Sequence, residues 1–356
     1  MSAPQVYTEE IFDGSIYFFY AFDVGDDIDF EQVRTAPGLS TSKANLSKYF
    51  KNYHRPLQIN SSELPNECIS VKVHSFGALS LTYRVPFSST LAHVQARLDH
   101  LEDQYNEYAL AHAQIVFKKI RSFITKPKFY HTRSSYVTIQ VEPVPQIDAV
   151  TFKERYGGII ASSVRFEVET LSEFQKNEIL DTAIGYYRGD LIVIDTDAAF
   201  VYDDEYQEIL DFFEFANVQQ LELQYFDRVL DQQLNSIYEG KTQGVPFRAY
   251  LPFVGTLLKG PVDELSKLKV DISVITERLE SSIKIAGEPY FYELYSILVD
   301  KLDLKGWRDS IDKKLAIVKD ASSVLQKKID SVREDLLTTL IIILIFIEVL
   351  VGLLRL

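Results

Sequence analysis

Two acidic motifs have the composition of a metal-binding site. Asp195-Thr196-Asp197 follows a short apolar run, and Asp23, Asp26, Asp27 and Asp29 follow a predicted strand. Carboxylates are typical ligands of divalent cations. However, Asp195-Thr196-Asp197 also suits a hairpin turn, and the spacing of the four aspartates is not that of a known calcium loop. We favour a turn and a solvated acidic loop, and keep a membrane-bound, metal-dependent enzyme as the alternative.

Other chemical motifs are incomplete. Gly240-Lys241-Thr242 is similar to the end of a phosphate-binding loop, but it follows a helix, and Asn235 occupies the position of the first glycine. With Cys68 as the one cysteine, a chain can form neither a disulfide nor a cysteine zinc site by itself. Histidines spaced four apart on a helix are also absent among His54, His74, His93, His100, His112 and His131. We therefore predict no catalytic residue, no metal and no cofactor.

The chain is acidic, with a formal net charge of -14. Residues 261–335 hold thirteen Lys and Arg against fifteen Asp and Glu, so most of the acidity lies in the first 260 residues. A surface of this sign repels phosphate backbones. We therefore expect no direct binding to nucleic acid.

The elements that must position these residues are strands mixed with helices. Apolar and β-branched runs predict four strands and a hairpin, at 15–22, 70–74, 78–86, 135–144 and 191–202. Apolar residues spaced three and four apart predict a helix over 90–123. Residues 1–203 are thus expected to form an α+β body.

Residues 204–335 are predicted to be helical. The first helix, to about Tyr238, has apolar side chains around much of its girth and should be buried on two sides. Two later segments carry heptads, at 265–279 and from Ile311 onward, and a short helix is expected over 291–302. We predict an antiparallel helical hairpin and a homo-oligomer whose seam comprises Ile311, Leu315, Val318, Leu325, Ile329 and Val332.

A C-terminal stretch, 336–354, is predicted to cross a membrane. Fifteen of its nineteen residues are Leu, Ile, Val or Phe, and as a helix it would span roughly 28 Å, close to the thickness of a bilayer's hydrocarbon core. The residues assigned to this anchor include Leu336, Ile341, Leu344, Phe346, Glu348, Leu354 and Arg355. Lys327, Lys328 and Arg333 precede the stretch, which favours a body on the cytoplasmic side. The alternative is an apolar helix buried in a large soluble oligomer.

Glu348 is the acidic residue of this stretch. A carboxylate in hydrocarbon is costly and usually has a partner or a role. It either reaches the interface and pairs with Arg355, or makes a polar contact between protomers. A third interpretation is an oligomeric pore with Glu348 facing the lumen.

The second half of the chain carries an ordered set of short motifs, which comprise Gly189-Asp190-Leu191-Ile192-Val193, Phe215-Ala216-Asn217, Leu230, Pro289-Tyr290-Phe291-Tyr292, Glu293-Leu294-Tyr295 and Ile345-Phe346-Ile347-Glu348-Val349. By these motifs, residues from about 171 to the C-terminus resemble the "required for meiotic nuclear division" family, an unknown-function domain. The resemblance implies a membrane-anchored, oligomeric scaffold or tether without established catalytic residues. Mitochondrial members lie at the inner membrane and support organellar translation. The first 150 residues are assigned no resemblance.

These observations predict a non-catalytic, membrane-anchored scaffold that presents an acidic body to a cytoplasmic protein partner. The expected partners are the lipid bilayer, further copies of the chain and that unidentified protein. The N-terminus has neither a secretory signal nor a mitochondrial presequence. The expected lack of a presequence differs from the mitochondrial members and favours a bacterial protein of the cell inner membrane.

Overall fold

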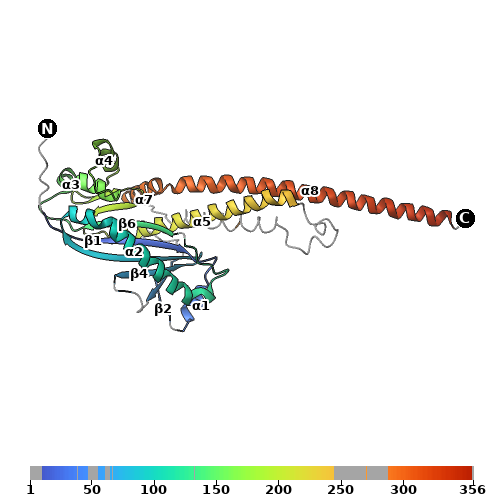
Figure 1. Ribbon diagram of the computed structural model, residues 1–356, viewed down its shortest axis with the longest axis horizontal. Helices are drawn as coiled ribbons and strands as arrows, with labels where there is room; N and C mark the ends of the chain where they lie inside the picture. The colour runs from blue at the N-terminus through green and yellow to red at the C-terminus, as the bar shows by residue number, and fades with distance from the viewer. Residues whose placement is uncertain are drawn as a thin grey trace. The chain divides into compact units, whose positions relative to one another are not determined.

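The computed structural model describes residues 10–37, 39–46, 55–60, 65, 67–131, 133–243, 270 and 288–354. Its strands form one mixed sheet in the order β2-β3-β4-β5-β1-β6-β8-β7 (Figure 1). The strands are β1 (Phe12–Asp23), β2 (Ser40–Lys43), β3 (Leu57–Asn60), β4 (Cys68–His74), β5 (Ala78–Ser89), β6 (Arg133–Val141), β7 (Leu191–Ile194) and β8 (Ala198–Tyr202). With its helices, the sheet confirms the predicted α+β class.

β1 is the centre of the sheet and is buried on both faces. It pairs antiparallel with β5 and with β6, and among its residues Asp13 alone is exposed. Successive side chains of a strand point to opposite faces. Phe18 on one face stacks on Tyr105, with ring centroids 5.0 Å apart, while Ala21 on the other clusters with Val218 and Leu221. Burial on both faces explains the unbroken apolar run in this part of the sequence.

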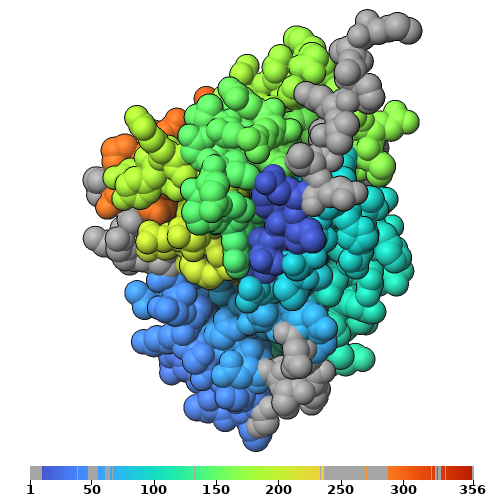
Figure 2. All heavy atoms as spheres, turned by 90° about the vertical axis from the view of Figure 1, so that its left-hand side faces the viewer, coloured from blue at the N-terminus to red at the C-terminus, as the bar shows by residue number. Residues whose placement is uncertain are grey.

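One face of the sheet is covered by α2 (Leu91–Ile120) and α3 (Ala149–Val164) (Figure 1). Thr90 caps α2 by accepting a hydrogen bond from the backbone N–H of His93. On α3, the ring of Phe152 stacks on that of Tyr202 of β8, with centroids 4.0 Å apart. Figure 2 shows one end of this unit, where dark-blue residues at the start of β1 lie between green α3 and the cyan segment of β5 and α2. These contacts place the apolar core on this side.

The opposite face lies under the first part of α5 (Gln207–Gln243). This interface carries buried polar groups as well as apolar ones. Asn217 donates through its amide to the backbone oxygens of Phe19 and Ser134, and the ring of Phe213 packs on Tyr136. The prediction that this helix is buried on two sides is confirmed by the buried residues along it, which include Phe212, Phe213, Phe215, Val218, Leu221 and Leu223.

The connection from β6 to β8 was not predicted. β6 and β8 are parallel neighbours, whereas β7 and β8 form the predicted antiparallel hairpin. Parallel strands need a long crossover, and here α3, α4 (Glu173–Leu180) and β7 form it. Two short helices, α1 (Phe30–Thr35) and η1 (Arg121–Phe123), lie in other connections.

The chain divides into two compact units. The first, called the α+β unit below, comprises Met1–Leu223 with Leu279–Lys305, and the second comprises Gln224–Arg278 with Gly306–Leu356. Residues 203 and 204 both lie inside the first unit, and the predicted domain boundary between them stays a prediction. The first turns of α5 pack on the sheet, and α7 (Pro289–Lys301) joins the same unit through an ion pair between Lys301 and Asp195. α8 (Leu304–Leu353) forms most of the described part of the second unit. The predicted heptad helix over 265–279 lies outside the described residues.

Candidate functional site

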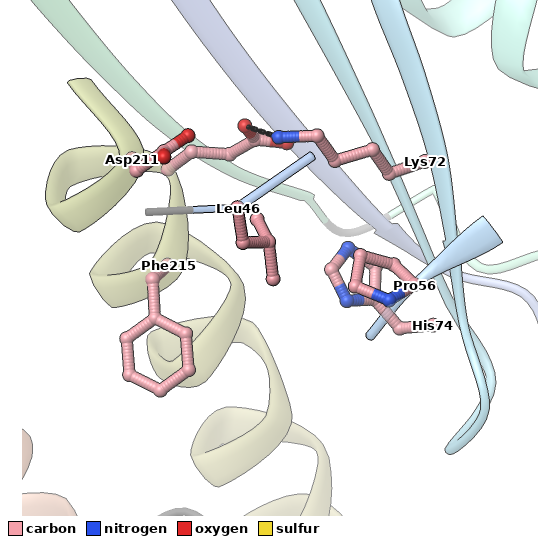
Figure 3. Close-up of a pocket in the computed structure, with 7 residues that line it drawn as sticks. Leu46, Pro56, Lys72, His74, Asp211 and Phe215 are labelled. Carbon is pink, nitrogen blue, oxygen red and sulfur yellow. Dashed lines mark hydrogen bonds and ion pairs between the residues drawn. The ribbon is translucent and has the colours of Figure 1, made fainter. Parts of the chain in front are cut away.

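A buried ion pair connects the sheet to α5. The Nζ atom of Lys72 on β4 lies 2.5 Å from Oε2 of Glu214 on α5, and both residues are less than a tenth exposed. The dashed line in Figure 3 marks this pair. Burial alone would lower the pKa of Lys72, but Glu214 and Asp211 outweigh burial and raise it. Burial likewise raises the pKa of Glu214, but Lys72 more than offsets it, so that pKa is lowered and both groups are charged.

Ser80 and His74 complete a chain of polar contacts. The Ser80 hydroxyl donates to Oε1 of Glu214 at 2.8 Å, and Nε2 of His74 lies 3.1 Å from the Ser80 oxygen. Burial lowers the pKa of His74 to about 4, so its ring is neutral near pH 7. Because the serine proton goes to Glu214, His74 must donate to Ser80. A nucleophilic serine needs the opposite direction, with the imidazole accepting the serine proton.

A small hollow lies beside this ion pair. Its volume is about 10 Å³, room for about one water molecule, and Phe215, Leu46 and Pro56 supply apolar walls next to Lys72 and His74 (Figure 3). Sequence reasoning missed this group. Lys72 and His74 alternate with buried Val71 and Val73 along β4, a pattern that also fits a solvent-facing strand face. The one available signal of burial was the apolar side chains around most of the helix that covers Lys72 and His74.

The Asp195-Thr196-Asp197 motif lies in the predicted turn, and Asp195 forms ion pairs within its own chain. Asp195 is 1% exposed and pairs with Arg165, at the end of α3, and with Lys301 of α7. The hydroxyl of Tyr136 donates to the backbone oxygen of Asp195 at 3.0 Å. The side chain of Asp195 therefore connects the hairpin to two helices.

The aspartates between 23 and 29 are also held by local contacts. Oδ1 of Asp23 accepts the N–H of Gly25, and Asp29 accepts the N–H groups of Glu31 and Gln32 as the N-cap of α1. Asp26 pairs with Lys126 at 3.1 Å. In the described part of the chain, no group of three or more His, Cys, Asp or Glu side chains is placed to hold a metal ion.

Asp203 is a buried carboxylate without a cationic partner among the described residues. It is 7% exposed, and its Oδ1 accepts the backbone N–H of Glu205 at 2.9 Å. Burial, followed by the negative charges of Asp190, Asp204 and Glu205, raises the pKa of Asp203 to about 6. The hydrogen bond from Glu205 opposes this shift without cancelling it.

We expect Asp203→Asn to stabilise the protein at pH 8 by about 1 to 2 kcal/mol and to have little effect at pH 4. The folded pKa of Asp203 lies above its unfolded value, so wild-type stability falls as pH rises from about 4 to 6. The side-chain oxygen of Asn can still accept the backbone N–H of Glu205, and because Asn does not ionise, the variant does not lose stability over this pH range. Urea unfolding at both pH values measures the effect. Exposed Asp27→Asn is the control, and an Asp203→Asn variant no more stable than it at pH 8 would contradict the expectation.

The described residues contain one helix long and apolar enough to cross a membrane, over Asp330–Leu353. Its most apolar 18-residue window has a mean hydropathy of 2.8, and none of that window is buried in the structure. Of the predicted anchor residues, Leu336 is half-buried, whereas the exposed ones are Ile341, Leu344, Phe346, Glu348 and Leu354. Arg355, the predicted partner of Glu348, lies outside the described residues.

The predicted oligomer seam divides into two parts. Ile311, Leu315 and Val318 are already buried within one chain. On the same helix, Lys314 forms 2.7 Å ion pairs with Asp227 and Asp231 of α5, both in the second unit. Ile311, Leu315 and Val318 thus pack within one chain, and the assignment of the seam to an oligomer contact stays a prediction. Val332 is half-buried, and the side chains of Leu325 and Ile329 lie outside the described residues.

These features define an α+β protein with one candidate membrane-spanning helix. Residues 13–208, more than half of the chain, match the family described as the N-terminal domain of the uncharacterized protein MJ0711, and the chain belongs to this family. The match includes most of the first 150 residues, to which the sequence analysis assigned no resemblance.

The uncharacterized protein MJ0711 of Methanocaldococcus jannaschii is 24% identical over 208 residues. The match covers 58% of this chain and 62% of that protein, so it spans less than two thirds of the relative's length. No solved structure matches the chain.

Proposed function

We propose that the protein is a non-catalytic, membrane-anchored scaffold, in which the C-terminal part of α8 spans a bilayer and carries the acidic α+β unit. The observation that carries the proposal is the exposed apolar surface of the helix over Asp330–Leu353. Exposed apolar patches of this extent mark membrane or protein interaction sites. A lipid bilayer is the partner that matches a continuous apolar helix of this length.

The polar groups of the α+β unit support a binding role over a catalytic one. Asp195, Asp23 and Asp29 are held by their own chain, and His74 donates to Ser80 instead of accepting its proton. The unit as a whole is acidic, which suits a basic protein partner. The basic residues before the span, Lys327, Lys328 and Arg333, favour a cytoplasmic position for it.

Self-association is the second part of the proposal. The predicted seam, together with the membrane segment, would hold the copies together. Glu348 would then make a polar contact between helices in the bilayer. The resemblance of residues 171–356 to the "required for meiotic nuclear division" family supports the same membrane-anchored, oligomeric role.

We expect a chain that ends at Asp335 to leave the membrane fraction, because it lacks the apolar segment. Fractionation measures this release, and light scattering of the full-length chain in mild detergent measures oligomer mass. A chain that ends at Leu353 keeps the span and is the matched control. The truncated chain remaining in the membrane fraction would contradict the anchor, and monomeric full-length protein at high concentration would contradict the oligomer.

A further inference from the structure

Three tyrosines, two exposed and one half-buried, form a cluster on the α+β unit. Tyr186 and Tyr187 lie in the turn between α4 and β7, and Tyr290 lies in the first turn of α7. The ring centroids of Tyr186 and Tyr187 are 4.7 Å apart, and those of Tyr186 and Tyr290 are 5.3 Å apart. In Figure 2, yellow-green residues lie beside orange residues of α7 at one edge of the unit. Tyr186 and Tyr187 are 58% and 69% exposed, so aromatic surface is open to solvent.

The turn that carries these rings is held in one conformation. The backbone N–H of Tyr187 donates to Oδ2 of Asp190 at 2.9 Å, and Ile184 bridges to Ile192 at the base of the turn. Gly185 is required for the close approach, because a Cβ atom there would lie 2.3 Å from the backbone oxygen of Asp190. A preformed aromatic surface binds a ligand at a lower cost in conformational entropy.

Carboxylates adjoin the cluster, and the nearest by geometry is Asp190, which accepts the backbone N–H of Tyr187. Asp203 is more than nine-tenths buried and has no cationic partner among the described residues. Burial and then the charges of Asp203, Asp190 and Glu293 raise the pKa of Tyr290, so these carboxylates act on its hydroxyl.

The polar groups of the cluster are also incompletely satisfied. The buried hydroxyl of Tyr290 has no hydrogen-bond partner in the described part of the chain. Among the described residues, no ion pair joins Arg188, the cation in the turn, to Asp190 or Asp203. The cluster thus combines open aromatic faces with carboxylates that no cation of the turn neutralises.

We propose that Tyr186, Tyr187 and Tyr290, with Asp190 and Asp203, form a docking surface for an arginine-bearing segment of a basic partner protein. A guanidinium group stacks on tyrosine faces while its N–H groups reach carboxylates. A lysine ammonium gains the charge attraction but not the stacking of a planar group. The inference rests on the proposed scaffold function, because it names the chemistry of the partner that the acidic unit would hold.

Fluorescence anisotropy with labelled hexa-arginine and hexa-lysine peptides tests the surface, using the full-length chain in lipid nanodiscs at physiological ionic strength. We expect hexa-arginine to bind about fivefold more tightly than hexa-lysine. Tyr186→Leu/Tyr187→Leu should weaken hexa-arginine binding about tenfold and remove the preference for arginine. Asp203→Asn should weaken both peptides, because it removes a negative charge.

Phe174→Leu is the matched control, since Phe174 on α4 is 75% exposed and is not a member of the described ring contacts of this cluster. It should bind both peptides as the wild type does. Equal affinity of the wild type for the two peptides, or a double variant that binds as the control does, would overturn the proposal. Membrane fractionation of the same variants separates the two ideas. A double variant that loses the preference for arginine but stays in the membrane fraction would support the docking surface independently of the anchor. Wild-type protein that leaves the membrane fraction would reject the anchor.

Discussion

Lys72→Met should destabilise the α+β unit by about 3 to 5 kcal/mol at pH 8, because it leaves the carboxylate of Glu214 buried without its counter-charge. Methionine has a similar length, so the loss reflects charge more than packing. In the wild type, the folded pKa of Glu214 lies below its unfolded value, and its contribution is lost as pH falls through that window. In the variant, burial raises this pKa instead, so the loss should shrink as pH falls towards 4. Urea unfolding followed by circular dichroism measures both effects.

The double variant Lys72→Met/Glu214→Leu separates this explanation from a simple loss of contacts. Replacing both members of a buried pair by apolar groups is often close to neutral, so most of the stability should return. Lys176→Met is the surface control, because Lys176 pairs with exposed Glu173 and should contribute less than about 0.5 kcal/mol. A double variant as unstable as Lys72→Met would mean that the pair is not the cause.

Leu344→Arg/Ile345→Arg should abolish membrane insertion of the full-length chain. Each arginine near the centre of a span costs about 2.5 to 3.5 kcal/mol, and each replaced apolar residue forfeits about 0.3 to 0.6 more. Leu344 and Ile345 lie in the middle of the exposed apolar stretch, 63% and 55% exposed. The total cost exceeds the few kcal/mol by which the wild-type segment favours the bilayer. Flotation of membranes on a density gradient measures the fraction that stays bound.

The control places the same two charges elsewhere on α8. Ser323 and Val324 are exposed on the part of this helix that precedes the span. Ser323→Arg/Val324→Arg adds an equal charge there and should float with the membranes as the wild type does. If both variants behave alike, net charge and not insertion governs the association.

Six of the eight strands and the long helices were predictable because their signals are local, whereas β2 and β3 were not predicted. The apolar run of β1, the spacing of α2 and the uniform apolarity at the end of α8 each follow from neighbouring residues. Small residues in α3, such as Gly157 and Ala161, gave no such signal. Gly157 lies close to Leu180 of α4, since a Cβ there would be 2.7 Å from a methyl group of that leucine. Its role therefore depends on a tertiary contact.

The polar group under α5 was not predictable because its members are distant in the sequence. Lys72 and Glu214 are 142 positions apart, and Ser80 and Glu214 are 134 apart. Lysine, serine and glutamate are each residue types that are common at solvent-exposed positions. The aromatic cluster likewise brings together Tyr186 and Tyr290, which are far apart in the sequence. The heptads from Ile311 predict an apolar stripe on the helix, but periodicity alone does not identify the partner that covers it.

Alkaline carbonate extraction of membranes that contain the full-length chain tests the central claim most directly. Carbonate releases proteins held by charge or by other proteins and leaves a spanning helix in the lipid. The account predicts that the chain stays in the membrane pellet with its apolar helix inserted. Complete release into the supernatant would contradict it, and would mean that the exposed stretch over Asp330–Leu353 is covered by protein instead of lipid.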